Sequence, residues 1–369
     1  MIPVCEPTLG GNEKKYVTEC LDTNWISSNG RFLEEFEEKF SKFCDTKYGV
    51  CCSNGTTALH LAVASLGIGK GDEVIVPDFS MIAIANAVLY TGALPVFVDS
   101  EMKTWNVDTT KIEEKITSRT KAIMAMHTYG CPADMDAILA IARKHGLKVI
   151  EDCAEAHGAL YKGKKVGSIG VAGCFSFYGN KILTTGEGGM VVTNDKEIAD
   201  KARRLRNHAF AEQRFVHAEV GFNYRLTNIQ AAIGVAQVER AGELVKARQT
   251  NAARYNEELR SVPGITLPPS CPYGTNVYWM YGILVDKEKF GRGKDEIMKL
   301  LEESGIETRS FFYPMHLQPV YQNDSAIDCS GNYPVSEQLY AQGFYLPSAS
   351  HLTHDQIKQV CATLKSLKK

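Results

Sequence analysis

The fold is decided by residues 174–194, which read CFSFYGNKILTTGEGGMVVTN. Aromatic residues precede Lys181, and a glycine-rich stretch followed by β-branched residues comes after it. This pattern predicts a strand, a tight turn that carries the lysine, a glycine-rich loop and a second strand. A lysine amine held among aromatic side chains is partly desolvated, which lowers its pKa and makes it nucleophilic. Taken alone, such a lysine is more often an exposed turn residue, so the rest of the chain decides its role.

The composition is that of a globular protein with two or three domains. The chain has 369 residues, of which 44% are hydrophobic and 23% are charged. The net charge is −2, so the chain has no excess positive charge that would attract nucleic acid or an anionic membrane. The sequence shows no run of about 20 apolar residues and no signal-peptide pattern at its N-terminus. Its eleven cysteines are scattered, so we expect reduced thiols, no metal site and a cytoplasmic protein.

Strand and helix patterns alternate through the first 250 residues. Short apolar runs predict strands at 48–52, 73–77, 94–99, 121–127 and 148–152. Helical spacing of apolar residues predicts helices at 13–21, 31–43, 58–64, 82–90, 108–116, 135–145, 198–206 and 229–237. This alternation predicts an α/β fold with a mostly parallel sheet that is covered by helices on both faces. Sheets of this kind bind ligands at the carboxyl ends of their strands.

A long helix expected at about 240–259 separates two parts of the chain. We place the domain boundary within it, which gives a large domain with an N-terminal arm (1–248) and a small α+β domain (249–369). In the small domain we expect strands at 278–285 and 307–309 and helices at 294–304, at 335–342 and from 355 onward. The aromatic stretch 311–316 is either a lip of the substrate site or a hydrophobic plug between the domains.

Four features would meet at the carboxyl edge of such a sheet. The turn Ser53–Thr57 joins a strand to a helix, and the free N–H groups of a helix N-terminus attract anions. Asp152 ends a buried strand, Ser176 ends the next predicted strand, and Lys181 follows it. Each feature also has a plain structural interpretation: Ser53 or Thr56 would cap one helix, Asp152 would cap another turn, and Ser176 would be a strand-end serine.

One cofactor, pyridoxal phosphate, would use all four features together. Its phosphate suits a helix N-terminus with neighbouring hydroxyl groups, and its aldehyde forms a Schiff base with a lysine. A carboxylate such as Asp152 keeps the ring nitrogen protonated, so that the ring can accept electrons from the reacting carbon. The sequence therefore predicts a pyridoxal phosphate enzyme with Lys181 and Asp152 as its catalytic residues.

The whole chain resembles the DegT/DnrJ/EryC1/StrS family of sugar aminotransferases. The motifs that carry the resemblance are WISS (25–28), SNGT (53–56), VIEDCAEA (149–156), SFYGNK (176–181), TGEGGM (185–190), NYR (223–225) and YPMH (313–316). The resemblance implies a fold-type I large domain like that of aspartate aminotransferase, followed by a smaller C-terminal domain. It also implies a homodimer whose two active sites are shared between the subunits.

The resemblance implies a role for several positions. Lys181 matches the Schiff-base lysine, and Asp152 matches the partner of the ring nitrogen. The matches to phosphate contacts are Gly55, Thr56 and Ser176, together with Asn223, which would reach the phosphate of the neighbouring subunit. Glu155 stands near the ring hydroxyl, where many members have glutamine. Positions that would face the substrate are Ser28, His157, Tyr313 and His316.

Two positions depart from the usual pattern. Met81 stands where the family usually has an aromatic residue stacked on the cofactor ring, and a thioether packs there less specifically. His157 stands where the perosamine-forming branch often has phenylalanine. It would either reach the cofactor or substrate as an acid or base, or fill space.

The implied reaction is transamination at C4 of a nucleotide-linked 4-keto-6-deoxy sugar, with L-glutamate as amino donor. Glu155 is typical of the branch that converts GDP-4-keto-6-deoxymannose to GDP-perosamine, which is our first expectation. The alternatives are a dTDP- or UDP-4-keto-6-deoxyglucose aminotransferase that forms viosamine, and a non-enzymatic regulator on the same fold. Related dehydratases carry histidine in place of the lysine, so Lys181 argues against that activity. We expect no nucleic-acid or membrane partner.

Overall fold

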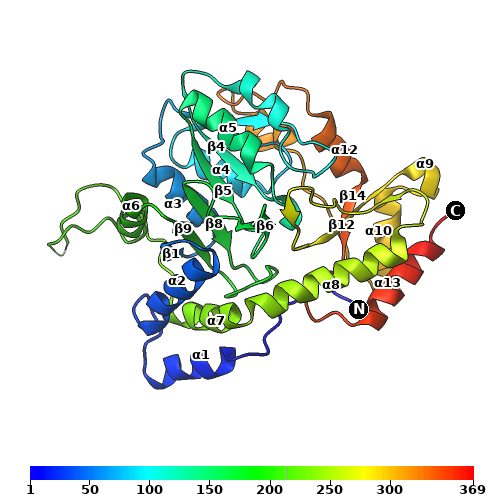
Figure 1. The fold of residues 1–369 in the computed structure, drawn as a ribbon, viewed down its shortest axis with the longest axis horizontal. Coiled ribbons are helices and arrows are strands. Elements are labelled where there is room, and N and C mark those ends of the chain that lie inside the picture. Colours follow the sequence, from blue (N-terminus) through cyan, green and yellow to red (C-terminus); the bar gives the residue numbers. More distant parts are fainter. Residues whose placement is uncertain (214) are drawn as a thin grey trace.

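The computed structural model describes residues 1–213 and 215–369. At its centre is a seven-stranded sheet with the order β1-β9-β8-β5-β4-β2-β3 (Figure 1). The strands are β1 (Tyr48–Cys52), β2 (Glu73–Pro77), β3 (Leu94–Val98), β4 (Thr120–Met126), β5 (Lys148–Asp152), β8 (Ala172–Ser176) and β9 (Gly189–Thr193). Strand β9 runs opposite to the other six strands of this sheet. The expected mostly parallel sheet is confirmed.

Helices cover both faces of this sheet. One face is packed by α2 (Arg31–Phe43), α5 (Met135–His145) and α7 (Asn228–Glu239), with α1 (Glu13–Asp22) outside α7. The other is packed by α3 (Gly55–Ser65), α4 (Ala83–Leu89) and α6 (Lys196–Arg206). Successive strand residues such as Ile75 and Val76 enter opposite core clusters, because side chains alternate along a strand. Both faces are therefore buried, which is why the strands read as continuous apolar runs.

The long helix α8 (Ala241–Leu259) joins the two parts of the chain and runs along their lower side in Figure 1. Its first turns, with Ala241 and Leu244, pack in the core of the large domain. Its last turns, with Tyr255 and Leu259, pack in a separate C-terminal core. The proposed boundary at residues 248 and 249 falls between these two sets of contacts.

The C-terminal part is built on a four-stranded antiparallel sheet with the order β10-β12-β14-β13. Its strands are β10 (Ile265–Thr266), β12 (Tyr281–Val285), β13 (Arg309–Ser310) and β14 (Gly343–Leu346). Its helices are α9 (Lys287–Phe290), α10 (Lys294–Glu303), α11 (Pro319–Gln322), α12 (Pro334–Gln342) and α13 (His354–Ser366). A small sheet of β6 (Leu160–Tyr161), β7 (Lys164–Lys165) and β11 (Gly274–Thr275) links the two parts.

One predicted helix is wrong. Residues 108–116 form two short 3₁₀ turns, Thr109–Lys111 and Glu113–Lys115. The Asp108 carboxylate accepts hydrogen bonds from both the amide and the hydroxyl of Thr110, which favours a tight turn over a continuous helix. The strand predicted at 278–285 begins at Tyr281, because Tyr278 has a positive φ of 50° that a strand cannot accommodate.

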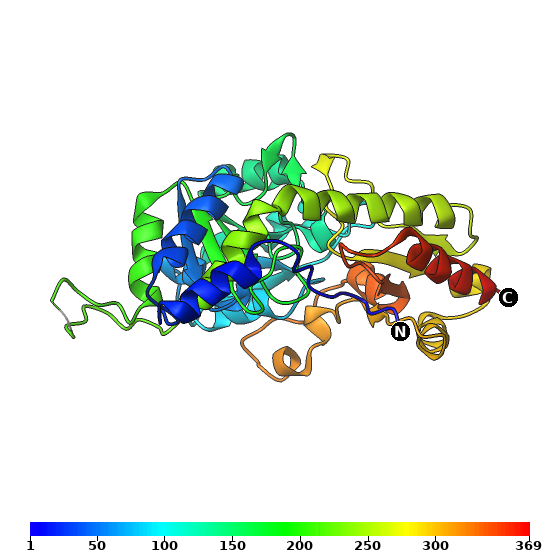
Figure 2. The same cartoon turned by 90° about the horizontal axis from the view of Figure 1, so that it is seen from below.

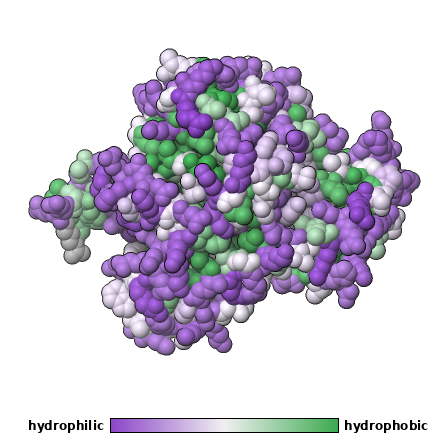
Figure 3. Space-filling model, viewed as in Figure 1, coloured by the Kyte–Doolittle hydropathy of each residue, from purple (hydrophilic) through white to green (hydrophobic). Residues whose placement is uncertain are grey.

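An arm formed by residues 207–213 and 215–223 leaves the body of the molecule beside α6 (Figure 1, Figure 2). Two isolated β-bridges, Asn207 to Asn223 and Phe210 to His217, join its two sides. Within this arm Val216 and Val220 are 45% and 88% exposed. Figure 3 shows hydrophobic residues on the surface of the projecting arm. Within the described residues, no helix has both the length and the apolar character that crossing a membrane requires.

Candidate active site

A cavity of about 450 Å³ lies at the carboxyl edge of the large sheet. Five strands deliver residues to it, because β1, β2, β4, β5 and β8 all end at this edge. It contains seven of the residues that the sequence predicts for the site: Gly55, Thr56, Met81, Asp152, Glu155, Ser176 and Lys181. The structure therefore brings together the predicted anion turn, carboxylates and lysine.

The turn after β1 leaves two amides free for an anion. The N-cap of α3 is Asn54, whose side chain accepts from the Thr57 amide at 2.9 Å, while the Thr57 hydroxyl accepts from the Asn54 amide at 3.1 Å. The cap is therefore Asn54, and the expectation that Ser53 or Thr56 would cap this helix is wrong. The amides of Gly55 and Thr56 bond to no described residue, so they can bind an anion at the positive end of α3.

Gly55 is required for this turn to meet the end of β8. A Cβ atom at Gly55 would lie 2.7 Å from Cβ of Ser176, which is closer than real side chains approach. Without a side chain, the start of α3 and the Ser176 hydroxyl come together at one end of the cavity. Two amides and a hydroxyl thus form a cradle of the size and polarity that a phosphate group needs.

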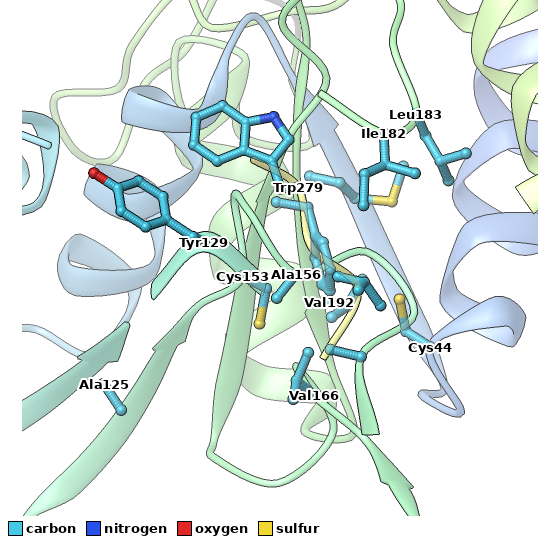
Figure 4. Packing of buried hydrophobic residues seen from close by; sticks show 14 of the residues in the cluster. Cys44, Ala125, Tyr129, Cys153, Ala156, Val166, Ile182, Leu183, Val192 and Trp279 are labelled. Atoms are coloured by element: carbon cyan, nitrogen blue, oxygen red, sulfur yellow. The ribbon is translucent and has the colours of Figure 1, made fainter. Parts of the chain in front are cut away.

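The Lys181 amine lies in a desolvated position within the cavity. Its Nζ is 3.7 Å from the centre of the Trp279 ring, and no ion pair joins it to a described carboxylate. Burial lowers the pKa of Lys181, although the nearby charges of Glu155 and Asp152 oppose that shift. A hydrogen bond of 2.8 Å from Trp279 Nε1 to the Asn180 carbonyl fixes the indole. Figure 4 shows this indole to the left of Ile182, the residue that follows the lysine.

Two carboxyl groups from β5 and the turn after it face the same amine. Asp152 Oδ1 accepts a 3.0 Å hydrogen bond from the Ala154 amide, and Oδ2 bonds to no described residue. Burial raises the pKa of Asp152, with the Ala154 bond and the Lys181 charge opposing the rise. Glu155 Oε2 accepts from the Tyr129 amide at 2.8 Å, and burial raises the pKa of Glu155 to about 8. The site therefore offers one carboxylate open to a cationic partner and a second carboxyl group whose pKa is raised by burial.

Three residues of the C-terminal part complete the cavity and were not predicted from the sequence. Trp279, Phe312 and Tyr345 form an aromatic wall opposite the sheet edge. Phe312 belongs to the aromatic stretch 311–316, so the composition indicated this segment but not the individual residue. In that stretch Phe312 lines the cavity while Phe311 is buried in the core, so its placement is compatible with both interpretations given for it.

Five predicted site residues lie outside this cavity. Asn223 is exposed at the base of the arm, and Tyr313 is 40% exposed with its ring against Tyr340. Ser28 lines a different cavity of about 600 Å³ near α2. His157 is fully buried, and His316 is almost fully buried; each lies beside the cavity rather than in it.

The His157 ring is surrounded by phenylalanines. Its ring centre is 5.4 Å from those of Phe175 and Phe177 and 6.1 Å from that of Phe40. Neither ring nitrogen makes a hydrogen bond of good geometry with a described residue, although the Ser176 backbone lies close enough to oppose part of the pKa shift. Burial, reinforced by the Lys181 charge, lowers the pKa of His157 to about 3, so the ring is neutral near pH 7. This placement favours the space-filling role over acid–base chemistry.

A second polar cluster, formed by His127, Glu151 and Cys153, lies buried behind the cavity. His127 Nδ1 accepts from the Ala133 amide, so Nε2 carries the proton and donates to Glu151 at 3.1 Å. The remaining acceptor positions of Glu151 are taken by amides of the neighbouring loop, those of Gly167, Ile169 and Gly170. The carboxylate is saturated, so this cluster is a structural network that supports the strand end at Asp152.

The model of the DegT/DnrJ/EryC1/StrS aminotransferase family matches residues 7–365. This chain belongs to that family. It is 48% identical to GDP-perosamine synthase of Caulobacter vibrioides, over 98% of this chain and 97% of the relative. It is 44% identical to GDP-perosamine synthase of Vibrio cholerae, over 99% of both chains. The crystal structure of S. venezuelae DesV in complex with a ketimine intermediate matches at a TM-score of 0.90 and 36% identity, over 96% of this chain and 94% of DesV.

These comparisons confirm the fold class, the pyridoxal phosphate cofactor and the assignment as a sugar aminotransferase. The residues of the cavity fit that cofactor. The open amides of Gly55 and Thr56 beside Ser176 suit its phosphate, and the unbonded oxygen of Asp152 suits its ring nitrogen. Lys181 supplies a desolvated amine in the same cavity.

Proposed function

We propose that this chain transfers the amino group of L-glutamate to C4 of GDP-4-keto-6-deoxymannose and forms GDP-perosamine. The observation that carries the proposal is the similarity to two GDP-perosamine synthases, at 44% and 48% identity over at least 97% of every chain compared. The carboxyl group of Glu155, which lies in the cavity beside Lys181, supports it, because the resemblance ties a glutamate at this position to that branch.

The chemistry divides between the cofactor and the chain. When bound, pyridoxal phosphate supplies an aldehyde that carries the amino group and a ring that accepts electrons from the reacting carbon. Lys181 would act through Nζ, which would take the proton from the donor Cα and deliver it to the cofactor's aldehyde carbon; burial lowers the pKa of this amine and so favours the neutral form that accepts a proton. Asp152 holds a proton at the ring nitrogen through its open oxygen. The same two residues would serve both halves of the reaction.

The aromatic wall supports these roles by excluding water. Trp279, Phe312 and Tyr345 place apolar surface opposite the polar sheet edge. A dry cavity strengthens the electrostatic interactions of Asp152 and keeps the Lys181 amine desolvated. The wall comes from the C-terminal part of the chain, so closure of the site depends on both domains.

We also propose that two copies of this chain form the active unit and that the protein is cytoplasmic. Asn223 is exposed at the base of an arm that projects from the body, so its side chain is placed to reach a neighbouring subunit. The arm carries exposed Val216 and Val220, which are suited to burial against a second copy. All eleven cysteines are free thiols, which agrees with a reducing compartment.

The test records the visible absorption of the purified protein with pyridoxal phosphate through both half-reactions. L-glutamate should bleach the cofactor band, and after removal of glutamate GDP-4-keto-6-deoxymannose should restore it. Lys181→Ala is the control that should show neither change. Restoration only by dTDP- or UDP-4-keto-6-deoxyglucose would replace the proposal by the viosamine-forming alternative. If none of the three sugars restores the band, both the perosamine-forming and the viosamine-forming assignments are refuted.

A further inference from the structure

A buried carboxylate ties the segment Met315–His316 to the end of β2. Asp78 follows β2 and is fully buried. Its backbone carbonyl accepts from the Met315 amide at 2.9 Å, and its Oδ1 accepts from the His316 amide at 2.8 Å. Its Oδ2 bonds to Nδ1 of the His316 ring at 2.8 Å. Three hydrogen bonds thus join the end of β2 to a distant segment, and the two that involve His316 span 238 residues of the chain.

The His316 ring lies between two carboxylates, one hydrogen-bonded to it and one within ion-pair distance. Nδ1 faces Asp78, and Nε2 lies 3.3 Å from Oε1 of Glu337 on α12. The ring stacks on Tyr333 at 4.3 Å and 25°, so Asp78, Glu337 and the Tyr333 phenol are the titratable groups around it. The hydrogen bond to Asp78 puts a proton on Nδ1, and the nearby Glu337 carboxylate favours a second proton on Nε2. Burial lowers the pKa of His316, but Asp78 and Glu337 outweigh it and raise the pKa above its ordinary value.

This pairing connects two walls of the active-site cavity. Asp78 lies three residues before Met81, which lines the cavity where the cofactor ring would stack. His316 lies four residues after Phe312, which lines the opposite side, and three after the exposed Tyr313. Phe79 packs against Phe312 with ring centres 5.7 Å apart. The position of the Phe312–Tyr313 segment relative to Met81 is therefore set by the His316 contacts.

We propose that His316 is a positioning residue for the sugar acceptor: as an imidazolium between Asp78 and Glu337, it holds the Phe312–Tyr313 segment at the mouth of the cavity. This inference rests on the proposed function. Glutamate is small and reacts beside Lys181, inside the cavity. A nucleotide sugar is much larger, so its nucleotide must extend beyond the cavity; Phe312 lines the cavity, and the next residue, Tyr313, is exposed. Loss of the imidazolium should therefore affect the sugar half-reaction and spare the glutamate half-reaction.

The charged state also predicts a pH dependence. The pKa of His316 is raised in the folded protein. The stabilisation that the charged ring gives to the Phe312–Tyr313 segment is therefore complete below pH 6.5 and is lost as pH rises through the folded pKa. The KM for the nucleotide sugar should therefore increase on the alkaline side. The KM for glutamate should lack this His316-dependent increase.

The test compares His316→Asn with the wild-type protein, in the holoenzyme. Asparagine Nδ2 takes the place of ring Nδ1 and keeps the Asp78 bond, while the charge and the Glu337 contact are lost. We expect the KM for GDP-4-keto-6-deoxymannose to rise about tenfold, as for one charged hydrogen bond, and its alkaline dependence to disappear. The rate of the glutamate half-reaction should stay within about twofold of wild type. His351→Asn, at an exposed histidine that pairs with Glu6, is the matched control and should behave as wild type.

The outcomes separate this inference from the proposed function. A wild-type protein that cannot use the GDP sugar refutes the proposed function, and the inference falls with it. A wild-type protein that uses the sugar, with a His316→Asn variant of unchanged sugar KM and unchanged pH profile, refutes only the inference. In that case a lower thermal midpoint of the variant would assign His316 a purely structural role.

Discussion

Replacing His157 by phenylalanine should make the protein less sensitive to acid. The ring is fully buried among Phe40, Phe175 and Phe177, and neither nitrogen makes a hydrogen bond of good geometry with a described residue. Burial lowers the pKa of His157 to about 3, from an ordinary value of 6.5 in the unfolded chain. Between these values the unfolded chain binds a proton that the folded chain does not, so stability falls as pH falls below 6.5.

The size of the effect follows from the two pKa values. Between pH 7.5 and pH 5 the unfolded histidine becomes protonated while the buried one stays neutral, which costs about 2 kcal/mol of unfolding free energy. For a chain of this length that corresponds to a shift in melting temperature of about 2–3 °C. Phenylalanine has no such proton, so the variant should lose about 2 kcal/mol less than wild type over this range. The larger ring also changes packing, but that change is the same at both pH values and cancels.

The assay is urea unfolding of wild type and His157→Phe at pH 7.5 and pH 5, each saturated with pyridoxal phosphate. For each protein, the free energy of unfolding at pH 5 is subtracted from that at pH 7.5, and these differences are compared. His351→Asn serves as the exposed-histidine control and should keep the wild-type difference. An equal loss of stability in wild type and His157→Phe would show that the ring is not a neutral, buried group.

Three further substitutions test the cavity. Lys181→Ala should keep the fold and lower turnover by at least about 10³-fold, measured as product formed and by circular dichroism; normal transamination would remove the lysine from the mechanism. Asp152→Asn should keep the cofactor bound but lower kcat at least about 10²-fold, because it removes the charge that faces the ring nitrogen; an unchanged kcat would argue against that pairing. Gly55→Ala should weaken cofactor binding about tenfold in a fluorescence titration, since the new Cβ would lie 2.7 Å from Ser176. Gly242→Ala is the control, because a Cβ there meets nothing within 4 Å. Equal cofactor affinities of the two variants would contradict the assignment of Gly55 to the phosphate site.

The sheet and most of the site could be predicted because their signals are local. Continuous apolar runs such as 73–77 and 148–152 mark strands buried on both faces, and the residues that follow them necessarily share one edge of a parallel sheet. Lys181 and Asp152 could therefore be predicted to lie in one site, because both belong to this edge. The expected helix at 108–116 failed because its spacing suggested a helix while Asp108 and Thr110 formed a competing turn.

The parts that could not be predicted depend on long-range contacts. Trp279 and Tyr345 reach the cavity only through the packing of the C-terminal part against the sheet edge, and neither carries a local motif. His316 was predicted to face the substrate, whereas the structure places its ring between Asp78 and Glu337. Its contact with Asp78 spans 238 residues, and no local pattern of one sequence shows such a pairing. Asn54 was missed as a cap because its neighbours Ser53 and Thr56 are equally good cap residues by type.

The most direct test of the account is to identify the lysine that binds the cofactor. The holoenzyme is treated with sodium borohydride, which fixes the covalent bond between the cofactor's aldehyde and a lysine amine, and the labelled peptide is sequenced by mass spectrometry. The account predicts a single pyridoxyl label on Lys181, and none on the Lys181→Ala variant. A label on another lysine, or none at all, would contradict the assignment of this cavity as the active site.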